Sequence, residues 1–220
     1  GPTTITGGTF TAAGGTVRLE ETSNTTVAGT VSVGSASVAG GTSGTVVIQD
    51  SAVLTAGAMN LGDGDYKSGT VNQSAGTVTV GGVVRIGHYS LETSTYNLSG
   101  GSLALTGAPS GTVNPEGAAE QDGILYVGIN GTGRFVQTGG TASAHGIVLD
   151  GRTETAGIDT FTLNGGTFTV GASGITSGNL DANSAYSINL GGGTLSASDN
   201  WASGRLMNLT GAAGAAVLRE

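Results

Sequence analysis

Few side chains in this sequence are spaced so that they could act together on an ion or a substrate. Asp63 and Asp65 stand two residues apart in the run GDGD. Two carboxylates in a loop, joined by carbonyl oxygens, form the kind of ligand set that Ca²⁺ takes. The glycine-rich nonapeptide of calcium-binding β-helices is absent. We therefore expect a solvated corner here, keep Asp63 and Asp65 as a secondary metal hypothesis, and expect no cofactor.

Acidic residues also gather in a segment that holds Pro109 and Pro115. Glu116, Glu120 and Asp122 lie within or just after it. Long loops on a rigid scaffold often carry binding residues. These three acids are therefore candidate ligand-binding residues, although a solvated loop is the simpler interpretation.

The two histidines stand far apart in the sequence. His88 and Tyr89 follow Gly87, and His145 precedes an apolar run. Without neighbouring partners they do not form a metal-ligand pattern. We keep His88 and Tyr89 as candidate ligand-binding residues, with ordinary corner residues as the simpler interpretation.

The sequence predicts no catalytic residue. An enzyme that cleaves polysaccharide on a β-helix needs clustered carboxylates, often beside a basic residue. Lys67 is the only lysine, and the acids are sparse. The nucleophile elbow G-x-S-x-G and the phosphate-binding P-loop are both absent. We therefore expect a protein that is not an enzyme.

A repeat of about 26 residues organises the chain and would position all of these side chains. In its copies the first and third positions are mostly apolar, and a glycine pair or Ala-Gly and then a Thr or Ser follow; the copies begin at residues 71, 96, 135, 161 and 188. The separations are 25, 39, 26 and 27 residues. A period of this length is typical of one coil of a β-solenoid.

Alternation within each copy predicts two strands that meet at a glycine corner. Apolar residues occupy alternate positions before and after the glycines, and alternate side chains of a strand share one face. The corner glycines are Gly76, Gly101, Gly140, Gly166 and Gly193. A further apolar-x-apolar-Gly run precedes several copies, at 59–62, 84–87 and 125–128, and 147–149 is a fourth candidate. Three strands per coil predict a triangular cross-section, and the length predicts about eight coils.

The repeat is less regular elsewhere. A degenerate copy opens the chain at 3–10, and the glycine-threonine runs at 26–31 and 38–42 are spaced more closely than one coil, as successive sides of a coil would be. The 39-residue interval predicts a loop insertion at about 106–122, where prolines suit a segment outside the wall. We interpret residues 1–2 as an expression-tag scar and 3–220 as one β-helix domain, a fragment of a longer protein.

Composition limits the classes of partner. The 220 residues include 43 glycines and no cysteine, only 10% are charged against a typical ~25%, and the net charge is −8. Absence of a basic patch argues against nucleic acid, and absence of a long apolar run argues against membrane insertion of this segment. An uncapped β-helix end would expose pairing edges, so end-to-end self-association is a further hypothesis.

Runs such as GILYVGINGTGRFVQTGGT and DTFTLNGGTFTVG resemble the Gly/Thr-rich passenger repeats of bacterial exported surface proteins. Such repeats occur in autotransporter-like and PEP-CTERM-type proteins, and SINLGGGTLSASDNW resembles segments beside the autotransporter-associated β-strand repeat. The resemblance covers roughly 61–201. It implies a right-handed parallel β-helix on an exported, extracellular or cell-surface protein, and it brings no catalytic residues.

The leading functional hypothesis is a non-catalytic structural stalk or adhesin segment. The alternative is a module that binds an extracellular glycan or a surface protein through the 106–122 insertion. A polysaccharide-degrading enzyme and an ice-binding protein are less favoured. Thr77, Thr141, Thr167 and Thr194 share one motif position, but we expect the 39-residue coil and Ser102 to break that threonine ladder.

Overall fold

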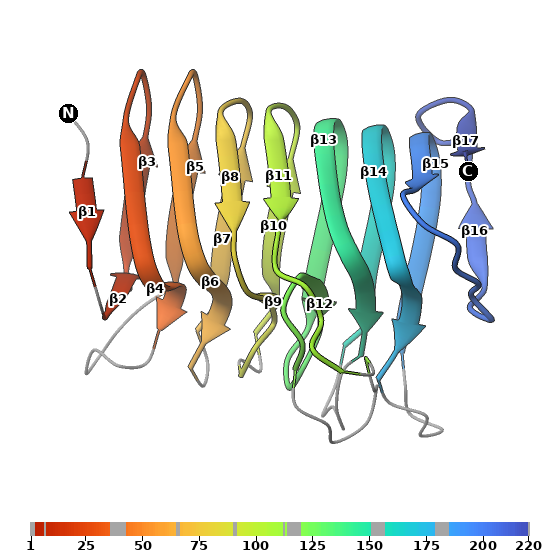
Figure 1. Cartoon of the computed structure of the whole chain (residues 1–220), viewed down its shortest axis with the longest axis horizontal. Coiled ribbons are helices and arrows are strands. Elements are labelled where there is room, and N and C mark those ends of the chain that lie inside the picture. Colours follow the sequence, from red (N-terminus) through yellow and green to blue (C-terminus); the bar gives the residue numbers. More distant parts are fainter. Residues whose placement is uncertain are drawn as a thin grey trace.

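All strands of the computed structural model belong to one 17-stranded sheet wound into a coil (Figure 1). The structure describes residues 3–6, 8–35, 43–64, 67–89, 92–111, 113, 120–150, 157–178 and 185–219. Every pairing is parallel, and strands about one repeat apart in sequence lie side by side. The predicted parallel β-solenoid is thus confirmed, with about seven turns. Its handedness stays a prediction.

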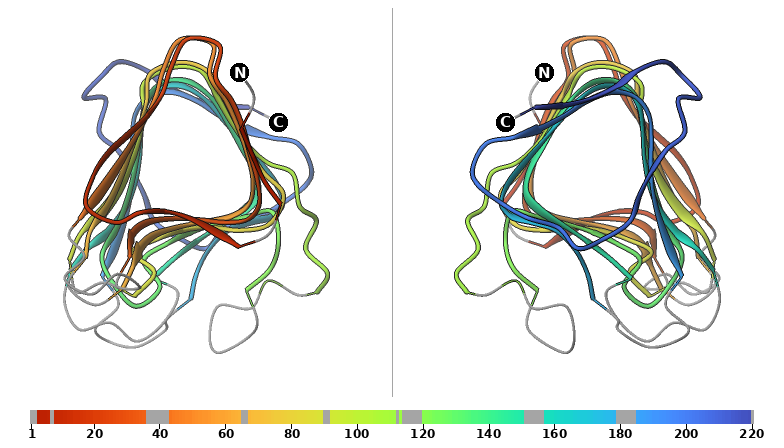
Figure 2. Two further views of the ribbon diagram at one scale, coloured as in Figure 1. Left: turned by 90° about the vertical axis from the view of Figure 1, so that its left-hand side faces the viewer. Right: turned by 90° about the vertical axis from the view of Figure 1, so that its right-hand side faces the viewer.

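Viewed along its axis, the coil is a triangle whose sides we call the first, second and third faces (Figure 2). The first face contains β3 (Gly15–Leu19), β5 (Gly44–Ile48), β7 (Gly69–Gln73), β10 (Ser94–Leu98), the starts of β13 (Gly133–Leu149), β14 (Asp159–Ser177) and β15 (Tyr186–Ala197), and β16 (Met207–Leu209).

The second face follows the first along the chain. It contains β1 (Thr3–Ile5), the starts of β4 (Asn24–Ser35) and β6 (Val53–Asp63), β8 (Thr77–Val80), β11 (Ser102–Leu105), the middle parts of β13 and β14, the end of β15, and β17 (Ala216–Arg219). The third face contains β2 (Thr9–Ala12), the ends of β4, β6, β13 and β14, and β9 (Val84–Ile86) and β12 (Ile124–Val127).

Inward side chains form columns because equivalent residues of successive coils are paired. One column of the first face runs through Val46, Val71, Tyr96, Phe135, Phe161 and Ile188. All six are buried. Phe135 and Phe161 stack at 5.4 Å between ring centroids, and Phe168 of the second face meets both edge-on. Such aromatic packing adds stability beyond area burial, and these ring contacts lie in the later coils.

Two buried glutamines brace the corner between the first and second faces. The amide nitrogen of Gln73 donates to the carbonyl oxygens of Gly76 and Ser102. The amide nitrogen of Gln137 donates in the same way to Gly140 and Thr167. Burial of these side chains is tolerated because their amide donors are satisfied by backbone carbonyl oxygens.

The predicted corner glycines lie where the first face turns into the second. Their φ angles range from 65° at Gly140 to 78° at Gly101, a conformation that disfavours a Cβ atom. At Gly101 an added Cβ would also overlap the carbonyl oxygen of Gly76 in the preceding coil. Glycine is therefore needed here both for the bend and for the stacking distance.

Third-face strands were predicted correctly at all four candidate positions. Met59, Val84, Leu125 and Ile147 are in register, as are Leu61, Ile86, Val127 and Leu149. Residues 26–31 prove to be successive sides of one coil, because Thr26 pairs within the second face and Val31 within the third. The run at 38–42 lies outside the described residues.

The opening copy at 3–10 was assigned to the wrong faces. Thr3–Ile5 pairs with Thr25–Val27 of the second face, and Thr9–Ala12 pairs within the third. A glycine corner between alternating strands occurs at more than one corner of the triangle, so the pattern alone does not identify the face. The solenoid has about seven turns, close to the eight coils predicted from the length of the chain.

The last turn departs from the others. Ile188 pairs with Met207 only 19 residues later, and residues 198–206 contain no strand. Trp201 packs beside Gly174, and the Ser203 hydroxyl donates to the carbonyl oxygen of Ile175 at 2.8 Å. This segment therefore crosses the edge of the third face without extending it.

Candidate functional site

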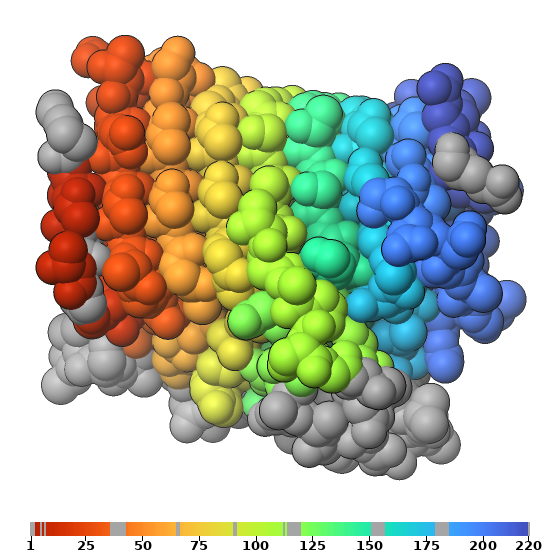
Figure 3. All heavy atoms as spheres, in the orientation of Figure 1, coloured from red at the N-terminus to blue at the C-terminus, as the bar shows by residue number. Residues whose placement is uncertain are grey.

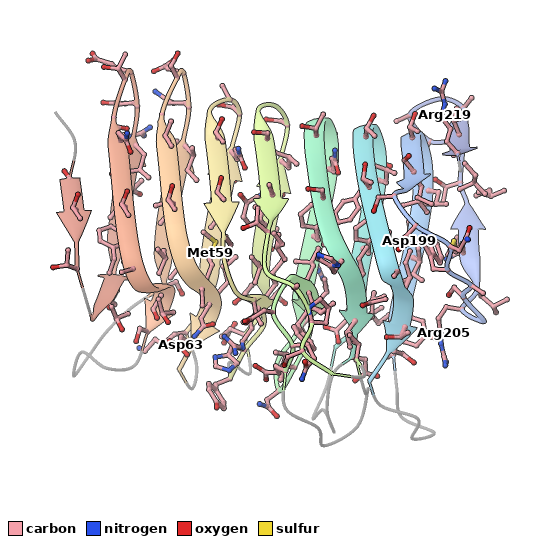
Figure 4. All side chains as sticks on the ribbon, viewed as in Figure 1. Met59, Asp63, Asp199, Arg205 and Arg219 are labelled. Atoms are coloured by element: carbon pink, nitrogen blue, oxygen red, sulfur yellow. The ribbon has the colours of Figure 1, made fainter. Side chains whose placement is uncertain are left out.

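Polar side chains gather where the third face turns into the first. Asp63 ends β6, and His88 follows β9 in the next coil. Figure 4 shows Asp63 at the lower end of its strand, whereas Met59 of the same strand belongs to the buried core. We call Ser32, Asn60, Asp63, Arg85, His88 and Asn130 the corner cluster.

Asp63 is the centre of the corner cluster. Its carboxylate accepts a 2.7 Å hydrogen bond from the Ser32 hydroxyl and contacts His88 Nδ1 at 2.8 Å. The His88 ring lies 3.9 Å from the Tyr89 ring, measured between centroids, and the His88 carbonyl oxygen accepts from the Asn130 amide. Three consecutive coils and one connecting loop are thus linked.

The environment favours the ionised form of Asp63. Burial raises the pKa of this carboxyl group, but hydrogen bonds from His88 and Ser32, the His88 charge and a hydrogen bond from Asn60 together outweigh burial. The net result is a pKa below the ordinary value of 3.8. The carboxylate is therefore a stable acceptor at neutral pH.

The order of the groups matters for chemistry. In a nucleophilic serine site, a histidine lies between the serine and the acid, so that it can take the serine proton. Here Asp63 lies between Ser32 and His88, and Ser32 donates its proton to a carboxylate of lowered pKa. This arrangement stabilises the corner and does not activate Ser32 as a nucleophile.

Arg85 links the corner cluster to the insertion. Its guanidinium group donates to the Asn60 side chain at 2.9 Å and forms an ion pair with Glu120 through Nε. Both partners of the ion pair are largely shielded from solvent. Glu120 is thus held against the outside of the coil by Arg85.

The described ends of the insertion pack onto the outside of the third face. The Gln121 backbone N–H donates to the Tyr126 hydroxyl at 2.9 Å, and Val113 contacts a small external apolar cluster. That cluster comprises Val83, Ile124, Tyr126, Ile129 and Val148. Tyr126 and Val148 point away from the interior yet are 5% and 1% exposed, because this second layer covers them.

Only some of the residues proposed from sequence lie close together in the structure. It brings Asp63 and His88 together, places Tyr89 against His88, and joins Glu120 to Arg85. Asp122 is exposed at the end of the insertion. Asp65 and Glu116 lie outside the described residues.

Sequence reasoning missed four members of the corner cluster: Ser32, Asn60, Arg85 and Asn130. A signal for two of them was present. Asn60 and Arg85 are 25 residues apart, as are Asp63 and His88, so each pair occupies equivalent places in consecutive coils. Aligning the copies of the repeat so that equivalent residues form columns would have identified both pairs.

Within the described ranges, no group of three or more His, Cys, Asp or Glu side chains is arranged to hold a metal ion. The same ranges contain no helix that is long and apolar enough to cross a bilayer.

A hollow of ≈ 730 Å³ lies at the C-terminal end of the coil, over the last turn. Leu195, Trp201, Met207 and Leu218 contribute to its lining. Leu209 and Leu218 continue inward columns, but they are 71% and 63% exposed because no further coil stacks on them. The hollow is therefore the open end of the interior.

Comparisons with known proteins found no matching family model, no matching curated protein and no matching solved structure. The resemblance to surface-protein passenger repeats accordingly stays a prediction.

Proposed function

We propose that this chain is a non-catalytic structural segment of a bacterial surface or secreted protein, acting as an extracellular stalk or as part of an adhesin. The observation that supports this proposal is the continuous parallel pairing of all three faces. Each coil is joined to its neighbours by backbone hydrogen bonds, and its inward columns pack against theirs. Such a stack resists bending and needs few special residues.

Charge supports the same proposal. The net charge is −8 and only 10% of residues are charged. An acidic surface of low charge density keeps a rod soluble and limits nonspecific association with other acidic macromolecules. Seven turns at the strand spacing correspond to about 34 Å of spacer.

Single-molecule stretching tests the stalk proposal. Held between its two ends, a load-bearing stalk should keep its length until it ruptures in a few large cooperative steps. Loss of coils one after another at the lowest measurable force would contradict the proposal, because a stalk that peels cannot transmit load.

A binding module that uses the 106–122 insertion is the second candidate. Two contacts favour it: the Arg85–Glu120 ion pair and the hydrogen bond from Gln121 to Tyr126 hold the end of the insertion on the wall. A preordered loop loses less conformational entropy when it binds. The partner would be an extracellular glycan or a surface protein.

A glycan-array screen separates these two functions. The intact chain is compared with a variant in which 106–122 is replaced by a short Gly-Ser turn. Specific binding that disappears in the variant would replace the stalk proposal with the binding module. Absence of binding by both proteins, with unchanged circular dichroism, is the result that the stalk proposal predicts.

End-to-end self-association is a related proposal. Leu209 and Leu218 leave the apolar interior open at one end, and a second copy stacked there would cover them. Sedimentation velocity should then show larger species as concentration rises, and Leu209→Asp with Leu218→Asp should abolish them.

A further inference from the structure

The outer surface of the second face carries two parallel rows of hydroxyl groups. The first row contains Thr77, Ser102, Thr141, Thr167 and Thr194. The second row contains Thr26, Thr55, Thr79, Ser143, Thr169 and Ser196, with Ala104 between Thr79 and Ser143. Successive members are direct neighbours across adjacent strands, so the rows run along the axis of the coil.

The 39-residue coil does not interrupt the first row, contrary to the sequence expectation, although Ala104 of this coil leaves one gap in the second row. Ser102 pairs directly with Thr141, and Ala104 pairs with Ser143. The extra residues leave the wall after β11, at the next corner of the triangle. Ser102 also retains a hydroxyl group, which lies 3.4 Å from the Thr77 hydroxyl.

No charged residue occurs in the second face between residues 24 and 197. Its segments are 24–27, 53–56, 77–80, 102–105, 141–144, 167–170 and 194–197. The first face differs, because Arg18 and Arg134 occupy outward positions, and one of its outward rows contains paired amides such as Asn72 and Asn97. These seven strands of the second face therefore carry no charge, unlike the first face, and Arg219 beside Ser196 adds a charge only in the last strand of the second face.

Above the insertion this face is also regular. Figure 3 looks onto it, and there the side chains of successive coils lie in level rows. Neighbours within a row are about 4.8 Å apart, and the two rows are about 6.7 Å apart, from the spacings of β-strands and of alternate residues. Because threonine is stiff at χ1, its hydroxyl and methyl groups are held in fixed directions.

We propose that the second face binds ice. Both spacings are close to repeats of oxygen atoms on the surfaces of an ice crystal, so water held between the rows can match the lattice. The absence of charge complements this partner, since strongly hydrated ions would impose a different order on nearby water. Methyl groups between the hydroxyls limit the number of competing hydrogen-bond geometries.

A crystalline polysaccharide is a less suitable partner for this surface. Flat sugar rings are usually held by aromatic side chains, and the outward positions of the described second face carry none. The proposal therefore commits to ice, and insoluble polysaccharide serves as an alternative outcome of the test.

Ice recrystallisation and partitioning into a growing ice front test the proposal. The intact chain should slow recrystallisation and enter the ice. Thr141→Lys combined with Thr167→Lys places two ions in the centre of the first row and should abolish both effects. Thr95→Lys combined with Thr160→Lys makes the same change on the outer side of the first face and should retain both effects.

Thermal unfolding followed by circular dichroism establishes that all three proteins are folded. Exclusion of the intact chain from ice would overturn the proposal. Equal loss of both ice effects in the two double variants would also overturn the proposal, because these effects would then not depend on the second face. Binding to insoluble cellulose or chitin, without any effect on ice, would assign the face to a polysaccharide instead.

Discussion

The first corner of the coil is built in two different ways at the two ends of the molecule. In the early coils the turn from the first to the second face contains Glu21 and Asp50, which have φ angles of 55° and 57°. In the later coils a glycine provides the positive φ angle. Ile48 pairs with Gln73 and Val53 pairs with Thr77, so the turn after Ile48 is one residue longer than the turn after Gln73.

Each version has its own stabilising contacts. In the early coils, Asp50 accepts a hydrogen bond from the Glu21 backbone N–H, and the Gln49 amide donates to Glu20, both between neighbouring coils on the exposed side. In the later coils, buried Gln73 and Gln137 donate to corner carbonyls from the inside. The same bend can thus be held from either side of the wall, and a glutamine braces it from the inside at the Gly76 and Gly140 corners.

The largest expected effect comes from adding a side chain to a glycine corner. Gly101→Val combines an unfavourable φ angle with overlap of the Gly76 carbonyl oxygen, and it should lower the free energy of unfolding by about 3 kcal/mol or more. Urea denaturation measures the change. Asp50→Ala is the matched control in an early corner, which already accepts a Cβ atom, and should cost about 1 kcal/mol. Equal losses of unfolding free energy in the two variants would contradict the proposed difference between the two kinds of corner.

Removal of a hydroxyl group inside a later corner should have a smaller effect. The Tyr96 hydroxyl donates to the side-chain oxygen of Gln73 at 2.7 Å, and burial raises the pKa of Tyr96 so that it remains a donor. Tyr96→Phe leaves a buried acceptor without its partner and should cost about 2 kcal/mol. A melting temperature that does not change would mean that this hydrogen bond adds nothing to the bracing.

The reverse change should stabilise the neighbouring glutamine corner. Phe161 stands to Gln137 as Tyr96 stands to Gln73, since each lies in the next coil, two residues before the leucine that pairs with its glutamine. The Gln137 side-chain oxygen has no hydrogen-bond partner among the described residues. Phe161→Tyr should therefore add about 1 kcal/mol to the free energy of unfolding. Destabilisation would indicate that the Phe135–Phe161–Phe168 packing leaves no room for the hydroxyl.

The smallest expected effect is a difference in how stability depends on pH between the partly buried Asp63 and the exposed Asp50. The pKa of Asp63 is lower in the folded chain than its ordinary value of 3.8. Its contribution to stability is therefore present above that value and is lost as pH falls through the lower folded pKa. Asp63→Asn should reduce stability at neutral pH and make it less sensitive to pH below about 4.

Asp50→Asn is the control for this pH dependence, because Asp50 accepts its hydrogen bond on the exposed side of an early corner. Melting temperatures measured from pH 7 to pH 2.5 check both variants. Identical pH profiles for Asp63→Asn and the unmodified chain would contradict the assigned role of Asp63.

The two versions of the corner also explain which parts of the fold could be predicted. The later coils share a glycine motif at nearly constant spacing, so their strands, faces and third-face partners followed from alternation alone. The early coils replace that motif with Glu21 and Asp50 in a longer turn, and their register could not be recovered. Acidic residues with a positive φ angle leave no distinct mark in a single sequence.

The corner cluster was only partly predictable for a similar reason. Asp63 and His88 were recognised singly, and the 25-residue offset that joins them follows from the repeat. Ser32 is 31 residues from Asp63, because Ser32 pairs with Asn60 and Asp63 lies further along the same strand, so no constant offset finds it. The external packing of Val113 and Gln121 depends on the path of an irregular loop, which local pattern does not encode.

Parallel pairing of each coil with only its immediate neighbours has a consequence for how the chain acquires its structure. A completed coil presents three edges that direct the next 25 or so residues, so folding can advance in the order in which the chain emerges from a ribosome or a secretion pore. Each added coil then buries its inward side chains against the coil before it, so the free energy of folding accumulates coil by coil along the axis.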